Sequence, residues 1–411
     1  HCRSTEFYLE GKVRDLSLAT NRRIADELFL NGVRRVHFLG GEPLVRKDFV
    51  RLAKHLKQLG IVWSVNTNGT LLTEQLARRL LDAGACVITV SLDGPDARSN
   101  DAVRGRGVFS RVCESIARLT RIRAETRSSA RVIISCTVVR QNQRRLGEMV
   151  DLAERLGVDN VVFSSLRLMG NARDAGELRS DGTPRLEMAR AIAKQLTSSP
   201  KCGVQLGFLT PIEIEDLNED LGGTFPIYDS SCNALVHKGY IQPDGALFPC
   251  QALTESANLP SGLGRIERRS LSTESFADIW YSPELQRIRD ALHDRRIDKR
   301  MLPCRYCKYY RVLCLPCPLG ALGGSWSVNQ GCLSAMSRMA GRRGLSEVSG
   351  RLAELALFGA HRRRTSEHEV EPGANSRDCG TYQTRGGAAC RTCRGGCKPP
   401  RLRTSLDVPR L

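Results

Sequence analysis

The first two hundred residues alternate between two hydrophobic periods. Apolar residues spaced three and four apart indicate amphipathic helices, and short β-branched runs ending in Gly, Asn, Ser or Asp indicate strands. The pattern predicts helices over residues 20–31, 48–60, 73–84, 109–122, 145–157 and 186–196, and strands over residues 34–40, 61–69, 86–94, 131–139 and 158–168. Because strands and helices alternate, we expect an α/β fold whose parallel strands are joined by right-handed crossovers.

The alternation fades after residue 185, so the chain divides into unlike segments. We expect a barrel-like domain over 1–185, a connector with one helix over 186–231, a Cys- and Gly-rich domain with short strands over 232–335, and a basic tail over 336–411. The tail holds one predicted helix and then Gly, Arg and four cysteines, a composition typical of partial disorder. No apolar run approaches the length of a transmembrane helix, and no secretory leader is visible, so no membrane contact is expected.

Cysteine content changes this picture most. The chain holds 16 cysteines, and nine of them follow residue 300. Secreted disulfide scaffolds are short and loop-rich, so this long, regular chain favours reduced thiols gathered for metal and a cytoplasmic location. The net charge of +18 comes mostly from scattered arginines, and aromatic residues make up only 5%. Neither feature suits a nucleic-acid groove, although attraction to an acidic peptide stays open.

Loops at three consecutive strand ends suit an amino-acid nucleoside. GGEP (40–43) combines paired glycines, which allow close approach, with a carboxylate that could accept hydrogen bonds from an ammonium group. NTNG (66–69) offers short polar side chains for ribose hydroxyls. In SLDGPD (91–96) and the helix that follows, Ser91 and Arg104 could hold a carboxylate. Each loop alone is a common turn, but ligands bind at the carboxyl ends of parallel strands, where these loops meet.

These stretches, GGEPLVRKDF, NTNGTLLT and SLDGPDARSNDAVRGRGVF, resemble the radical S-adenosylmethionine (radical SAM) superfamily. The resemblance runs from residue 1 to about 175 and implies a partial (β/α)6 TIM-like barrel that binds SAM. It implies SAM contacts from Gly40, Gly41 and Glu42 at the amine with Pro43 fixing the turn, from Asn66, Thr67 and Asn68 at the ribose, from Ser91 and Arg104 at the carboxylate with Asp93 in the same loop, and from Val138 at the adenine.

The family's CxxxCxxC signature binds a [4Fe–4S] cluster through three thiolates and leaves the fourth iron for SAM. Here only Cys2, preceded by His1, fits the signature, as its third cysteine. The other SAM-site motifs are intact, so we interpret the missing cysteines and the missing first strand as an N-terminal truncation. As given, the chain is therefore not expected to hold that cluster in its normal form.

The Cys-rich half carries a second resemblance. Its spacing is C-x12-G-x4-C, then C-x2-C-x6-C-x2-C, then one more cysteine. It resembles the SPASM extension of radical SAM enzymes, whose usual quartet reads C-x2-C-x5-C-x3-C. The resemblance implies two auxiliary [4Fe–4S] clusters, one on Cys304, Cys307, Cys314 and Cys332, the other on Cys232, Cys250 and Cys317.

Two questions about these cysteines stay open. Thiolates in such pairs bind zinc as well as iron–sulfur clusters, although no nearby His suggests a mixed zinc site. The cluster on Cys232 lacks an upstream fourth cysteine, so water, Cys202 or a substrate thiolate could complete it. The cysteines of the barrel, Cys86, Cys113 and Cys136, are expected to be small buried apolar side chains.

The resemblance implies an enzyme that cleaves SAM reductively to a 5′-deoxyadenosyl radical, which abstracts hydrogen from its substrate. We expect a ribosomally made peptide or a protein as substrate, crosslinked or oxidised, and an electron donor such as flavodoxin or ferredoxin. Gln251 stands where sulfatase-maturing relatives carry an Asp base, which argues against that reaction. The alternatives are maturation of a protein-derived or tetrapyrrole cofactor and a non-catalytic iron–sulfur or zinc binding module.

Overall fold

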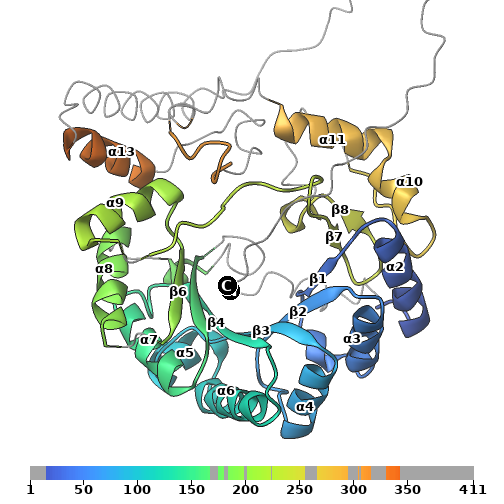
Figure 1. The fold of residues 1–411 in the computed structure, drawn as a ribbon, viewed down its shortest axis with the longest axis horizontal. Coiled ribbons are helices and arrows are strands. Elements are labelled where there is room, and N and C mark those ends of the chain that lie inside the picture. The colour runs from blue at the N-terminus through green and yellow to red at the C-terminus, as the bar shows by residue number, and fades with distance from the viewer. Residues whose placement is uncertain are drawn as a thin grey trace, which may run out of the picture. The chain divides into compact units, whose positions relative to one another are not determined.

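A six-stranded parallel sheet, curved into a partial barrel, organises the computed structural model of this chain (Figure 1). The structure describes residues 15–166, 175–179, 184–198, 201–223, 225–254, 266–294, 304, 307–315 and 330–342. The strands pair in chain order, and they are β1 (Arg35–Phe38), β2 (Val62–Thr67), β3 (Ala85–Ser91), β4 (Arg131–Val138), β5 (Asn160–Ser165) and β6 (Gly203–Gly207). All five neighbouring pairs are parallel, as the alternation predicted.

Helices connect the strands and cover the convex side of the sheet (Figure 1). They are α2 (Leu18–Leu30), α3 (Phe49–Gln58), α4 (Glu74–Asp82), α5 (Ala97–Arg104), α6 (Val108–Glu125), α7 (Leu146–Arg155), α8 (Arg185–Leu196) and α9 (Pro211–Leu221), with short 3-10 turns η1 (Pro43–Val45) and η3 (Gly176–Leu178). Among the described residues, no helix is both long and apolar enough to span a bilayer.

Strand alternation sorts the sheet into an apolar and a polar face. Side chains such as Trp63, Ile88, Ile134 and Phe163 are fully buried and pack with the covering helices in one hydrophobic core. The alternate positions face the concave side and are largely polar; they include His37, Ser64, Asn66, Thr89, Ser91, Ser135, Thr137 and Ser164. The concave side of the sheet is therefore a polar surface suited to a polar ligand.

The segment expected to be a connector contributes to the barrel. Residues 186–231 contain not one helix but most of α8, the strand β6 and the helix α9, and β6 pairs with β5 along its length. The sequence GVQLG hides this strand because glycine at both ends leaves one β-branched residue. The single-helix connector was therefore a wrong prediction, and the sheet extends past residue 185.

A second, smaller core lies in the Cys-rich half and includes one barrel helix. Its elements are β7 (Tyr240–Ile241), β8 (Leu247–Phe248), η4 (Gln251–Thr254), α10 (Phe276–Trp280) and α11 (Pro283–His293). Ile24 and Leu28 of α2 belong to this core, together with Leu247, Phe276 and Ile288. Backbone and side-chain bonds support the packing, since the Phe276 N–H donates to Glu27. The short antiparallel pair β7–β8 agrees with the predicted short strands.

The helix α13 (Gln330–Arg342) packs on α9 and crosses the boundary expected at residue 335. Asp216 of α9 is fully buried and accepts hydrogen bonds from Arg338 and Arg342 of α13. Residues 336–342 therefore belong to a packed helix and not to a disordered tail. The rest of the expected tail, with its predicted helix 345–359 and four cysteines, lies outside the described residues, as do Cys2 and Cys317.

Candidate functional site

Glu42 joins the first two predicted loops. It lies just past β1, where its side chain caps η1 by accepting a hydrogen bond from the Leu44 N–H at 3.1 Å. The same carboxylate accepts the Thr67 hydroxyl at 2.8 Å and the Asn68 N–H at 2.7 Å. The GGEP and NTNG loops are thus brought together, as their places on adjacent strand ends predicted.

The backbone of both loops requires glycine at specific positions. Gly40 has φ of 133° and Gly69 has φ of 79°, conformations that side-chain-bearing residues rarely adopt. A Cβ on Gly69 would also lie 2.7 Å from the Val90 side chain. Three other predicted residues lie in or beside these loops. Gly41 is exposed, Pro43 begins η1, and Asn66 faces the concave side of the sheet.

Arg104 is anchored to the third predicted loop by Asp93. The Arg104 Nε lies 2.8 Å from Asp93 Oδ2, and Asp93 is fully buried while the Arg104 side chain is 15% exposed. Burial raises the pKa of Asp93, whereas the Arg104 charge and the Thr137 N–H, which donates at 2.7 Å, oppose this shift. Ser91 ends β3 on the concave face, in register with Ser135. Ser91 therefore faces the concave side, and Arg104 is held beside the loop after β3 by the buried Asp93 carboxylate.

Two buried amides, which sequence reasoning missed, hold this loop in place. Asn142 donates to the carbonyls of Asp93 and Thr137, each at 2.7 Å, and Asn100 accepts the Asp93 N–H at 3.0 Å. Both side chains are fully buried. Asn142 could not be recognised from the sequence, because its partner Asp93 lies 49 positions earlier in the chain.

Val138 differs from its expected role. Its side chain is 9% exposed and belongs to the hydrophobic core, on the same face of β4 as Ile134 and Cys136. Strand alternation turns it toward the helices, and Thr137 is the neighbour that faces the concave side. This placement argues against a side-chain contact between Val138 and adenine.

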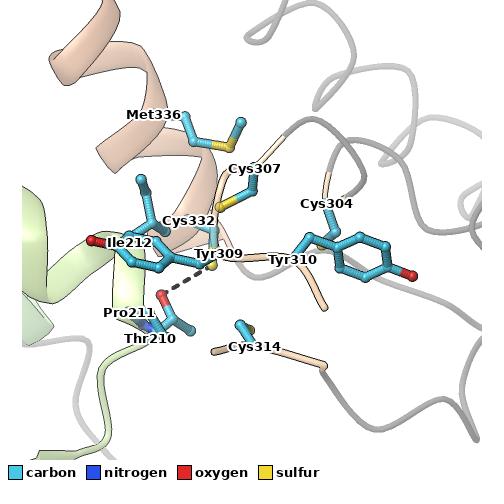
Figure 2. Close-up of a pocket in the computed structure, with 10 residues that line it drawn as sticks. All are labelled: Thr210, Pro211, Ile212, Cys304, Cys307, Tyr309, Tyr310, Cys314, Cys332 and Met336. Carbon is cyan, nitrogen blue, oxygen red and sulfur yellow. Dashed lines mark hydrogen bonds between the residues drawn. The ribbon is translucent and has the colours of Figure 1, made fainter. Parts of the chain in front are cut away.

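Four predicted cysteines line one pocket (Figure 2). Cys304, Cys307 and Cys314 come from the loop before α13, and Cys332 comes from α13 itself. The pocket has about 370 Å³ of space free of protein atoms, part of it open to solvent. Its other lining residues are Thr210, Pro211, Ile212, Tyr309, Tyr310 and Met336. The structure thus brings together a set of thiols that the resemblance to SPASM domains implied as one ligand group.

The thiols of this pocket are a donor set that fits an iron–sulfur cluster or a zinc ion, since four cysteine thiolates can hold either group. Burial raises the pKa of the Cys304 and Cys332 thiols to about 12 and also raises the pKa of Cys307 and Cys314. Metal uptake there would release protons, because ligation needs thiolates.

The second predicted group is partly described. Cys232 and Cys250 both pack against the smaller core, and burial, with Cys250 as a further cause, raises the pKa of Cys232. The Cys232 N–H donates to the Leu315 carbonyl at 2.9 Å, so this chain segment runs beside the Cys314 loop. Cys317, the third expected member, lies outside the described residues.

The remaining described cysteines belong to the barrel. Cys202 is 2% exposed, precedes β6 and packs in the barrel core, whereas Cys232 packs in the other core. Cys202 therefore does not lie where it could complete a cluster on Cys232. Cys136 is buried and Cys113 half-buried, but Cys86 is exposed, so its predicted burial is wrong. Cys86 is the second residue of β3, between buried Ala85 and half-buried Val87.

Thr210 is one of the pocket residues that sequence reasoning missed. It begins α9 in a capping box with Glu213, whose carboxylate accepts the Thr210 N–H at 2.9 Å. The Thr210 hydroxyl also donates to that carboxylate, at 2.8 Å. The hydroxyl oxygen lies 3.2 Å from the Cys332 sulfur (Figure 2). The signal was present in the sequence, because TPIE has the Thr-x-x-Glu spacing of a capping box with Pro at the first helical position.

Comparison with known proteins agrees with both halves of this description. A family model described as "Radical SAM superfamily" matches residues 1–153, and one described as "Iron-sulfur cluster-binding domain" (SPASM) matches residues 232–308. A PqqA peptide cyclase from Bradyrhizobium diazoefficiens is 23% identical over 307 residues, 74% of this chain and 73% of that protein. The mycofactocin maturase MftC from Mycolicibacterium smegmatis is 34% identical over 176 residues, 42% of each chain.

A solved structure shows the same fold. The anSMEcpe protein, with bound AdoMet and a Cp18Cys peptide, superposes with a TM-score of 0.55 and 14% identity, covering 81% of this chain and 91% of that one. The two family matches together span more than half of the chain. The chain therefore belongs to the radical SAM superfamily and carries a C-terminal SPASM domain.

Proposed function

We propose that this chain modifies a peptide or protein substrate by radical chemistry. One observation carries the proposal: a single chain combines the Glu42 junction of two strand-end loops with a pocket lined by four cysteines. With SAM and a reduced [4Fe–4S] cluster bound, the family's chemistry supplies a 5′-deoxyadenosyl radical that abstracts hydrogen from a substrate. The protein's own contribution is to bind, orient and shield the reacting groups.

The residues divide this work between the strand ends and the Cys-rich half. Glu42 would accept hydrogen bonds from the SAM amine, and Arg104, held by Asp93, would face the SAM carboxylate. Asn66 and Asn68 lie at the end of β2, where the ribose is expected. Cys304, Cys307, Cys314 and Cys332 would hold one auxiliary cluster, and Cys232, Cys250 and Cys317 would hold a second. We propose no general acid or base.

The substrate class rests on relatives and on the shape of the barrel. A PqqA peptide cyclase is among the similar proteins, and the structurally similar anSMEcpe was solved with a peptide. The polar concave face of the sheet, with Ser64, Ser135 and Ser164, offers hydrogen-bonding groups that an extended peptide backbone can use. We propose flavodoxin or ferredoxin as electron donor and, from the usage of free thiols, a cytoplasmic location.

Anaerobic reconstitution tests the proposal. Full-length protein is supplied with iron, sulfide, SAM and a low-potential reductant, and iron, labile sulfide and 5′-deoxyadenosine are measured. Iron–sulfur content with cleavage of SAM is the expected result, and adding the peptide encoded beside the gene should yield a product of changed mass. A colourless protein that holds zinc alone, or iron–sulfur content without any cleavage of SAM, would contradict the enzymatic function and favour a binding module.

A further inference from the structure

A hydrogen-bonded chain runs from the barrel to a predicted cluster ligand. Arg185 at the start of α8 pairs with Glu213, whose side chain is buried in the first turn of α9. Glu213 Oε2 accepts both the N–H and the hydroxyl of Thr210, and the Thr210 hydroxyl oxygen lies 3.2 Å from the sulfur of Cys332. A buried carboxylate therefore stands one hydroxyl group away from a thiol that lines the four-cysteine pocket.

The Thr210 hydroxyl has one hydrogen and two acceptors that compete for it. With a free thiol, Cys332 can donate to Thr210, and Thr210 can donate to Glu213, so all contacts are satisfied. A ligated Cys332 is a thiolate without a proton, and it can only accept. The Thr210 hydrogen must then point either to Glu213 or to the Cys332 sulfur.

The other bonds of Glu213 decide the competition. Without the Thr210 hydroxyl, the carboxylate still accepts the Thr210 N–H on Oε2 and Arg185 on Oε1. For the Cys332 sulfur, Thr210 is the side-chain partner among the described residues. If the Thr210 hydrogen points to the sulfur, the carboxylate keeps two donors and the thiolate gains a donor, so more acceptors are satisfied than in the opposite orientation.

We propose that Thr210 is a positioning residue that donates its hydroxyl hydrogen to the Cys332 thiolate and raises the reduction potential of that auxiliary cluster, while the Glu213 carboxylate lowers it. Hydrogen bonds to cluster sulfurs and nearby charge are two of the quantities that set such potentials. The inference rests on the proposed function only in requiring a cluster on Cys332. It assigns to α9, a barrel helix, control over how readily the cluster accepts an electron.

Three substitutions test this in the reconstituted full-length protein by redox titration followed by EPR. The signal of the relevant cluster is identified as the one lost in Cys332→Ser. Thr210→Val, which keeps the shape and removes the hydroxyl, should shift its midpoint potential downward, and Thr210→Ser should restore the wild-type value. Glu213→Gln, which removes the charge, should shift it upward. The control Thr120→Val also deletes a hydroxyl that bonds to backbone carbonyls, on α6, and should leave the potential unchanged.

A midpoint potential that is unchanged or raised in Thr210→Val would overturn the inference. A midpoint potential in Thr210→Ser that stays below the wild-type value would overturn it as well. A second measurement needs no variant: ENDOR of the wild-type cluster in H2O and D2O should reveal an exchangeable proton coupling, which Thr210→Ser keeps. If the wild-type cluster shows no exchangeable proton coupling, the inference is overturned. This measurement decides the question even if the Thr210→Val variant does not take up iron. Protein without iron and labile sulfide refutes the proposed function as well, whereas an intact cluster with an unmoved potential refutes only the role of Thr210.

Discussion

Replacing Asp216 by Asn should release α13 from the barrel helix α9. Asp216 is fully buried and accepts hydrogen bonds from Arg338 Nε at 2.9 Å, from a second Arg338 nitrogen and from Arg342. Breaking a buried ion pair costs about 3–5 kcal/mol when one partner stays buried without a charge opposite it. Because Arg338 and Arg342 are 39% and 35% exposed, and Arg342 also pairs with Glu219 at 2.9 Å and Asp220 at 3.2 Å, water and these carboxylates recover part of this loss. We therefore expect about 3 kcal/mol, or roughly a hundredfold increase in the opening of α13.

Hydrogen exchange read by mass spectrometry checks this expectation on peptides that cover residues 330–342. Faster exchange there, with little change in β2 or β3, is the expected result, and iron bound to the four-cysteine pocket should decrease because Cys332 moves with α13. Asp82→Asn is the matched control, since Asp82 is 67% exposed and pairs with Lys54 at the surface. Such a solvent-exposed pair contributes little to stability. Exchange in α13 that is unchanged in Asp216→Asn would refute the reasoning.

Other substitutions and a labelling experiment test the strand-end loops and the thiols. Glu42→Gln replaces one of two acceptor oxygens by an amide donor, which would face the donor groups of the NTNG loop. The Kd for SAM, measured by equilibrium binding, should therefore rise roughly tenfold or more. An unchanged Kd would contradict the proposal that Glu42 joins the two loops at the SAM site. Asn142→Ala should lower the free energy of unfolding, measured in urea, by about 3 kcal/mol, because the backbone carbonyls of Asp93 and Thr137 lose this donor. A loss of less than about 1 kcal/mol would contradict this expectation. Iodoacetamide at pH 8 should label exposed Cys86 and not buried Cys136. Burial raises the pKa of Cys113 to about 11, so its labelling should increase as the pH rises toward that value; a rate independent of pH would exclude this.

The sequence allowed the first five strands to be predicted because short apolar stretches alternate with amphipathic helices, and most of these stretches end at a loop of small polar residues. It failed at β6, where glycines replace the β-branched residues, although β6 completes the sheet. The cysteines could be grouped only through the resemblance to SPASM domains, because their spacing alone would have paired Cys314 with Cys317. Strand alternation would also have turned Val138 away from the ligand, but the resemblance to the family decided that prediction.

The missed contacts connect residues far apart in the chain. Asp216 and Arg338 are separated by 122 positions, as are Thr210 and Cys332. Each partner alone is an ordinary helix residue, and no periodicity indicates which acidic side chain will meet which arginine. Such pairs depend on how α13 packs on α9, so they became visible only when the three-dimensional arrangement was known.

The helix α2 comes early in the sequence, yet Ile24 and Leu28 are buried with residues that follow it by more than two hundred positions. Exchanging the chain after residue 231 with that of a relative would divide this core between two parents. The apolar face of α2 and the residues that cover it would then no longer match. A chimera made between two relatives should therefore fold only if residues 18–30 come from the same parent as the C-terminal half. An exchange between relatives would therefore have to follow the packed units of the fold. The unit that packs against Cys232 and Cys250 begins at α2, before the first strand of the barrel sheet.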